Sequence, residues 1–191
     1  MNITVYLGAS SGKSEKYADN AGKLGKWIGE HGHSLIYGGS REGLMGALAR
    51  GALEAGAHVT GVEPVFFIDS QLQLDGLTEL IITEDMAERK RLMIEKGDAF
   101  IAFPGGTGTL EEISEIMSMT ALASFTGDEK GRVRKPCILF NLDGYYDALR
   151  KLLAHMVKEG FSTPARLSGI HFADSLEEIF AVLGAAESGG R

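Results

Sequence analysis

The sequence predicts an α/β fold, a single-domain, doubly wound parallel sheet of Rossmann-like type with helices on both faces. Three observations predict it. Short apolar runs alternate with helical segments along the whole chain, and this alternation is typical of a parallel sheet covered by helices. Right-handed crossovers between such strands produce a doubly wound sheet. Glycine-rich turns also follow three of the expected strands, where the ligands of such sheets bind.

The elements follow from the spacing of apolar residues. Strands are expected where short apolar runs end in glycine or polar residues, at 3–7, 34–37, 57–62, 77–83, 98–103, 136–142 and 170–173. Helices are expected where apolar residues recur every three to four positions, at 13–31, 43–55, 85–96, 113–122 and 145–158, with a last helix after Ser175. We expect one domain over 1–183, a charged surface loop over 124–135 and a flexible tail over 184–191.

The composition limits the classes of function. The 191 residues are 44% hydrophobic, enough for one sizeable core. A net charge of −7 with no basic block argues against nucleic-acid binding. The single cysteine, Cys137, excludes an internal disulfide, and neither it nor the five scattered histidines predict a metal site. No cofactor is expected. The chain shows no signal-peptide pattern and no apolar stretch long enough for a membrane span, so we expect a cytoplasmic protein.

The most informative segment is Pro104 to Glu112, which reads Pro-Gly-Gly-Thr-Gly-Thr-Leu-Glu-Glu and follows a buried-strand pattern. A glycine-rich turn at the start of a helix presents backbone N–H groups at the positive end of the helix dipole, which suits a phosphate. Glu111 and Glu112 follow directly and would repel that phosphate. We therefore expect them to face a less anionic part of a nucleotide-type substrate.

Two side chains have a structural alternative to a functional role. Thr109 and Glu112 have the spacing of a capping box, in which Glu112 would only cap the helix. Arg89 lies on the expected buried stripe of its helix, between Met86 and Met93. It either reaches the surface along its aliphatic stem or is held in a partly dry crevice, where it would meet a phosphate or a carboxylate.

Two common nucleotide-binding motifs are absent. The turn after the first strand, 8–12, lacks the spaced glycines of dinucleotide-binding proteins, and no acidic residue ends the second strand. Neither Gly38 nor Gly105 leads into the Gly-Lys-Ser/Thr of a P-loop.

Three motifs together resemble the LOG family of cytokinin riboside 5′-monophosphate phosphoribohydrolases, often mislabelled "lysine decarboxylase". Residues 104–112 match its PGGxGTxxE signature, 86–90 (Met-Ala-Glu-Arg-Lys) resemble its MxxRK motif, and 38–46 resemble its glycine-rich turn ending in GLMG. The resemblance covers at least residues 1–183. It implies a Rossmann-like homodimer, with the active site near the subunit interface, that hydrolyses the N-glycosidic bond of a nucleoside 5′-monophosphate. The products would be a free base and ribose 5-phosphate.

The resemblance also implies site residues. Arg89 and Glu112 map onto catalytic positions. The predicted substrate-binding residues are Ser10, Gly38, Gly39, Met86, Lys90, Gly105, Gly106, Thr107, Gly108, Thr109, Glu111 and Ser118. An oxocarbenium-like transition state is stabilised by a nearby carboxylate, which can also deprotonate water; we assign that role to Glu112.

The sequence departs from the family pattern beside the expected base pocket. Val62-Glu63-Pro64 stands where the family commonly has IPxxL, Gln71 stands where it has a glutamate, and Met119 stands where a tryptophan is frequent. The competing hypothesis is a non-catalytic protein that binds a nucleotide or cofactor, similar to a molybdenum-cofactor carrier. Such a protein would keep the phosphate-binding turns but would not need the pair of Arg89 and Glu112.

Overall fold

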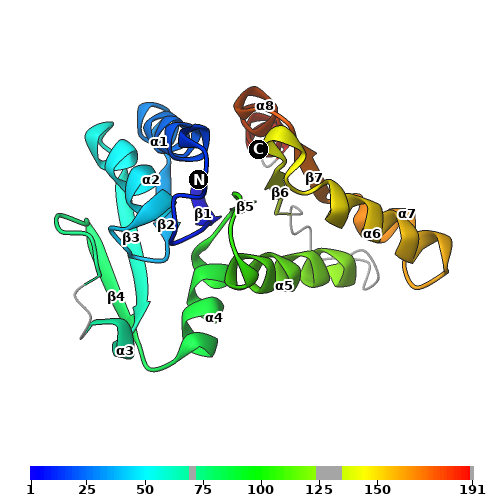
Figure 1. The fold of residues 1–191 in the computed structure, drawn as a ribbon, viewed down its shortest axis with the longest axis horizontal. Helices are drawn as coiled ribbons and strands as arrows, with labels where there is room; N and C mark the ends of the chain where they lie inside the picture. Colours follow the sequence, from blue (N-terminus) through cyan, green and yellow to red (C-terminus); the bar gives the residue numbers. More distant parts are fainter. Residues whose placement is uncertain (69–71, 124–134, 190–191) are drawn as a thin grey trace.

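The structure, a computed structural model, describes residues 1–68, 72–123 and 135–189. Within these ranges seven strands form one parallel sheet in the order β4-β3-β2-β1-β5-β6-β7 (Figure 1). The strands are β1 (Asn2–Tyr6), β2 (Ser34–Tyr37), β3 (His58–Pro64), β4 (Glu79–Thr83), β5 (Ala99–Ala102), β6 (Cys137–Phe140) and β7 (Ile170–Ala173). The predicted α/β class with a parallel sheet is confirmed.

Helices lie on both faces of the sheet (Figure 1). The described helices are α1 (Glu15–Glu30), α2 (Gly43–Glu54), α3 (Val65–Ile68), α4 (Met86–Lys96), α5 (Thr107–Ala123), η1 (Leu142–Gly144), α6 (Asp147–Lys158), α7 (Pro164–Leu167) and α8 (Leu176–Gly189). The short elements α3, η1 and α7 were not predicted, because segments of three or four residues carry no helical periodicity.

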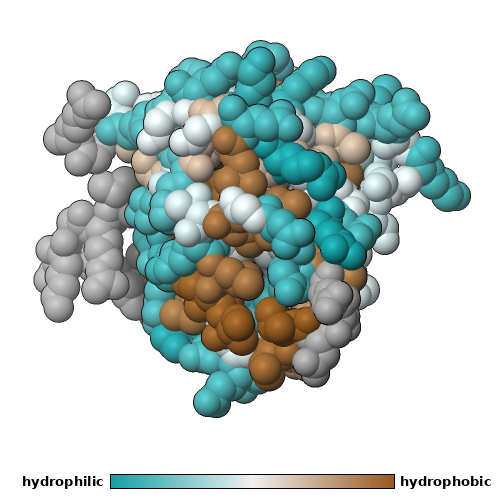
Figure 2. All heavy atoms as spheres, turned by 90° about the vertical axis from the view of Figure 1, so that its left-hand side faces the viewer, coloured by the Kyte–Doolittle hydropathy of each residue, from teal (hydrophilic) through white to brown (hydrophobic). Residues whose placement is uncertain are grey.

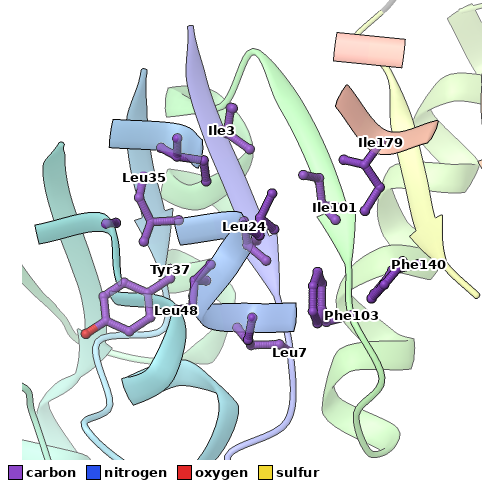
Figure 3. Packing of buried hydrophobic residues seen from close by; sticks show 14 of the residues in the cluster. Ile3, Leu7, Leu24, Leu35, Tyr37, Leu48, Ile101, Phe103, Phe140 and Ile179 are labelled. Atoms are coloured by element: carbon purple, nitrogen blue, oxygen red, sulfur yellow. The ribbon is translucent and has the colours of Figure 1, made fainter. Parts of the chain in front are cut away.

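Two hydrophobic clusters, one on each face, hold the helices to the sheet. Because side chains alternate along a strand, Ile3 and Val5 of β1 join the cluster under α1, α2 and α8, while Tyr6 joins the one under α4, α5 and α6. Figure 3 shows the first cluster, in which Leu24 and Leu48 come from the helices and Ile101 from β5. Strands buried on both faces explain the continuous apolar runs of the sequence.

The sheet order positions the ligand site. From β1 the chain adds β2, β3 and β4 on one side and β5, β6 and β7 on the other. The direction in which strands are added across the sheet therefore reverses between β1 and β5, although the two strands run parallel. In open parallel sheets a crevice forms at this switch point, beyond the carboxyl ends of the strands.

The carboxyl end of the chain differs from the prediction. Helix α8 continues to Gly189. Most of the segment expected to be a flexible tail, from residue 184 onward, is therefore helical. Leu183 is buried against the sheet, and Glu187 Oε1 lies 3.6 Å from His33 Nδ1. On α1 the Trp27 ring stacks on Phe180 of α8, with 4.3 Å between ring centroids. The expected loop over 124–135 lies outside the described residues except for Lys135.

One exposed surface of the molecule is apolar. Val65, Phe66 and Phe67 of α3 and Leu80 and Ile82 of the edge strand β4 are each more than a third exposed, and Figure 2 shows apolar residues gathered on this side. Among the described residues, no helix combines the length and apolar character needed to cross a bilayer.

Candidate active site

A cavity of about 640 Å³ lies at the carboxyl ends of the strands, where the ligand site was predicted. The turns after β1, β2 and β5 meet there, joined by the end of β3 and the start of α4 and α5. Its lining includes Gly8, Ser10, Tyr17, Gly38, Leu44, Met45, Glu63, Phe67, Leu72, Met86, Arg89, Gly105, Gly106, Thr107, Gly108, Thr109, Glu111, Glu112 and Tyr145. Segments from both halves of the sheet therefore build one site.

The glycine-rich turn after β5 leads straight into α5. The helix begins at Thr107, and the N–H of Leu110 donates to the carbonyl of Gly106. The N–H groups of the first helical residues have no acceptor within the helix and carry its positive dipole end. This end of the cavity therefore suits an anion such as a phosphate.

Two tyrosine hydroxyls form hydrogen bonds with carbonyl groups of the turn after β5. The Tyr146 hydroxyl donates to the carbonyl of Phe103 at 2.6 Å, and the Tyr145 hydroxyl donates to the carbonyl of Gly105 at 2.5 Å. Both carbonyls would otherwise need water. The bonds hold two carbonyls of the turn that lines the cavity.

A buried ion pair lies at the base of the cavity. Arg89 Nη1 donates to Glu112 Oε1 at 2.5 Å, and Arg89 Nε donates to the carbonyl of Val62 at 2.9 Å. Arg89 and Glu112 are 7% and 8% exposed. The guanidinium thus connects α4, the end of β3 and the first turns of α5 at the cavity.

Burial and the neighbouring arginine shift the pKa of Glu112 in opposite directions. Burial is the largest influence and raises the pKa of its carboxyl, while the neighbouring Arg89 guanidinium lowers that pKa. The net direction is upward. A carboxylate that stays paired but is more basic than usual is suited to accept a proton from water near neutral pH.

Both structural alternatives from the sequence are wrong. Helix α5 begins two residues before Thr109, and Glu112 bonds Arg89 instead of capping the helix end. Arg89 does not reach the surface: it is 7% exposed, and its guanidinium donates to Val62 and Glu112 inside the protein.

Most of the predicted site residues line the cavity, and three do not. Lys90 points to the protein surface, where its Nζ donates to Glu111 at 2.8 Å and lies 3.4 Å from Glu115; these contacts raise the pKa of Lys90. Ser118 is exposed further along α5 and does not line the cavity. Gly39 lies behind the cavity wall, against the side chain of Glu63.

The departures from the family pattern fall in different places. Glu63 lines the cavity, although the sequence assigned it no role. The sequence feature that could have identified Glu63 is an acidic residue within the apolar run of a strand. Met119 is exposed on α5 and does not line the cavity, so the expected effect on the base pocket does not appear within one chain. Gln71 lies outside the described residues.

Comparison with known proteins identifies relatives along nearly the whole chain. A family model described as "Possible lysine decarboxylase" matches residues 45–183. The cytokinin riboside 5′-monophosphate phosphoribohydrolase of Rhodococcoides fascians is 41% identical over 95% of this chain and 88% of its own length. The enzyme of that name called LOG7, from Arabidopsis thaliana, is 37% identical over 93% of this chain and 78% of its own length.

Solved structures share the fold. The molybdenum cofactor carrier protein of Chlamydomonas reinhardtii superposes with a TM-score of 0.73, at 21% identity over 98% of both chains. The molybdenum cofactor binding protein of Rippkaea orientalis superposes with a TM-score of 0.69, at 24% identity over 96% of this chain and 95% of that one. The predicted resemblance is confirmed by the family model and the curated relatives: the chain belongs to the LOG family, whose sequence model is described as "Possible lysine decarboxylase".

Proposed function

We propose that this protein hydrolyses the N-glycosidic bond of a nucleoside 5′-monophosphate and releases a free base and ribose 5-phosphate. The observation that carries the proposal is the buried pair of Arg89 and Glu112 beside the N-terminus of α5, inside one cavity. The curated relatives, named for this reaction on cytokinin riboside 5′-monophosphates, support it.

The substrate is placed by its charge. The 5′-phosphate rests on the N–H groups between Gly106 and Thr109, because the helix dipole and the unbonded N–H groups favour an anion there. Glu112 follows one turn later on the same helix, and its negative charge disfavours a phosphate. The ribose therefore lies over Glu112, and the base extends toward the ends of β2 and β3.

The charges match the reaction. Cleavage of a ribosyl bond places positive charge on the sugar ring, and the Glu112 carboxylate stabilises that charge in a site from which water is largely excluded. Glu112 also accepts the proton of the attacking water. Arg89 orients the carboxylate through its bond to Glu112 and keeps it ionised while no substrate is bound.

The carrier-type alternative has less support. The solved carrier proteins are similar at 21% and 24% identity, which shows the fold alone. A carrier that only binds its ligand does not need the buried pair of Arg89 and Glu112.

The test is release of free base from AMP and from isopentenyladenosine monophosphate, followed by chromatography. The wild-type protein should release base, and Glu112→Gln should reduce kcat by about 100- to 10,000-fold, the usual contribution of a positioned base. Glu115→Gln, three residues along on the exposed side of α5, is the matched control and should keep wild-type turnover. Tight nucleotide binding without any base release would favour the carrier instead.

We also propose that two copies of the chain form a homodimer in the cytoplasm. Ile113, Ile116 and Met117 of α5 face the core, while Leu110 and Met119 of the same helix are 43% and 48% exposed. A helix that is apolar on more than one side commonly packs against a second surface. Because α5 also carries Glu112, a second copy on this face would lie near the active site.

A further inference from the structure

The side chain of Glu63 is buried in an unusual way. It stands at the end of β3, is 2% exposed and lines the cavity. Among the described residues, its Oε2 has no hydrogen-bond partner. Buried carboxyl oxygens are almost always bonded, because losing water without a replacement costs free energy. Because Glu63 also lines the cavity, a ligand that reaches this side chain would supply the missing hydrogen bond.

The turn after β2 leaves room for this side chain. Gly39 has a positive φ of +88°, and a Cβ on it would lie 2.6 Å from Glu63 Cγ. A Cβ on its neighbour Gly38 would lie 2.5 Å from Arg89 Nη2. Two consecutive glycines thus make space for the two charged side chains.

The sheet order places Glu63 at the base end of the proposed substrate. Neighbouring strands are about 4.8 Å apart, so the end of β3 lies about 14 Å across the sheet from the turn after β5. With the phosphate at that turn and the ribose over Glu112, as proposed above, the base would extend toward Glu63. The cavity walls also include Leu44, Met45, Phe67 and Leu72, which suit the apolar faces of a flat ring.

The protonation of Glu63 sets what it can bond. Burial, the largest influence, raises the pKa of its carboxyl, and Arg89 lowers that pKa through charge alone, without the hydrogen bond that Glu112 receives. Of the two acids, Glu63 is the better suited to carry a proton. A neutral carboxyl offers one O–H donor and one C=O acceptor, the same pattern as a glutamine amide.

That pattern matches one class of base. A side-chain amide reads adenine through the amino group at C6 and the ring nitrogen N7. We propose that Glu63 is a specificity-determining residue that contacts the leaving base and selects 6-amino purines over 6-oxo purines. A 6-oxo purine presents two acceptors along that edge, so the Glu63 carbonyl oxygen would face another oxygen and neither would be bonded. The proposal rests on the nucleotide hydrolysis proposed above.

The experiment compares kcat/KM for AMP and IMP in the wild-type protein and in three variants. The wild-type ratio of AMP to IMP should exceed tenfold. Glu63→Met, of similar size but unable to bond the base, should lower that ratio by about 10- to 100-fold, chiefly through AMP. Glu63→Gln keeps one donor and one acceptor, so the ratio should stay within about threefold of wild type. Glu84→Gln, an exposed acid after β4 that does not line the cavity, is the control.

Two outcomes would overturn the role of Glu63. One is a wild-type ratio of kcat/KM for AMP to that for IMP near one, a result that does not depend on the folding of any variant. The other is a folded Glu63→Met protein, checked by its melting temperature, that loses AMP and IMP turnover equally. Failure of the proposed hydrolase function can be distinguished from both outcomes, because no nucleotide would then release its base. In that case, dissociation constants of AMP and IMP from titration calorimetry on the same proteins give the ratios instead.

Discussion

The ion pair of Arg89 and Glu112 shows how a buried charge is kept at an active site. Both side chains are almost fully removed from water, and each alone would be costly to bury. Together they neutralise one another, while the Val62 carbonyl accepts a hydrogen bond from Arg89 Nε. Burial leaves the carboxylate more basic than usual, so the same contacts serve stability and chemistry.

The raised pKa of Glu112 predicts the acid side of the pH profile. Glu112 must be ionised to accept a proton, so kcat/KM should fall as the pH drops through its pKa. Because burial moves that pKa upward, the fall should occur at higher pH than the value of about 4.3 for an exposed glutamate. Initial rates of base release between pH 4 and 9 measure it. A profile that stays flat down to pH 4.5 would contradict the assignment.

Gly39 offers a residue-scale test of the cavity wall. Gly39→Ala should lower the free energy of unfolding by about 1–3 kcal/mol, because φ is positive and the new Cβ meets Glu63. Gly56→Ala is the matched control, with φ of +81° and no atom near the new Cβ. Urea unfolding of both variants isolates the contribution of the contact with Glu63. Equal losses of unfolding free energy in the two variants would show that this contact does not affect stability.

At the scale of elements, the turn after β5 depends on a partner from a distant segment. Tyr145 precedes α6, yet its hydroxyl bonds the carbonyl of Gly105 at the start of the proposed phosphate site. The packing of α6 is therefore coupled to the shape of that turn.

Tyr145→Phe tests this coupling. Loss of the hydroxyl should raise KM for AMP by about 2- to 10-fold, equivalent to one neutral hydrogen bond of about 0.5–1.5 kcal/mol, with a smaller effect on kcat. Steady-state kinetics of base release measure the split. Tyr17→Phe, also at the cavity wall but from α1, is the comparison, and a loss confined to kcat would contradict a positioning role for Tyr145.

The sequence predicted the parts of the site that depend on local order. Pro104 to Glu112 and Met86 to Lys90 were recognised because the turn chemistry and helix spacing are written in consecutive residues. Glu63 was missed, because its contacts with Gly39 and its place in the cavity depend on how β2 and β3 pair. Lys90 and Ser118 were placed by resemblance, and the helix rotation that turns them outward cannot be read from a motif.

For the whole molecule, the order of strands determines what the cavity joins. The β1–β5 switch brings the turn after β5 beside those after β1 and β2, so segments as distant in the sequence as Leu7 and Tyr145 line one space. The alternating apolar runs predicted such a sheet. They could not predict which apolar helix face remains uncovered, because exposure depends on the complete packing.

The proposed homodimer is tested by mass in solution. Light scattering after gel filtration should give twice the 20.4 kDa of one chain. Met119→Glu, on the exposed side of α5, should shift the protein toward one chain by placing charge in the interface. Phe66→Glu, on the exposed surface of α3 and β4, should leave the dimer intact. The reverse pattern would place the interface on the α3 side.

The stacking of Trp27 on Phe180 has an optical consequence. The chain contains one tryptophan, and its ring lies 7° from parallel with a ring of α8. Tryptophan emission therefore comes from a single position, the junction of the first and last long helices. A red shift in that emission would report the last helix leaving the sheet, without any added label and separately from events at the cavity.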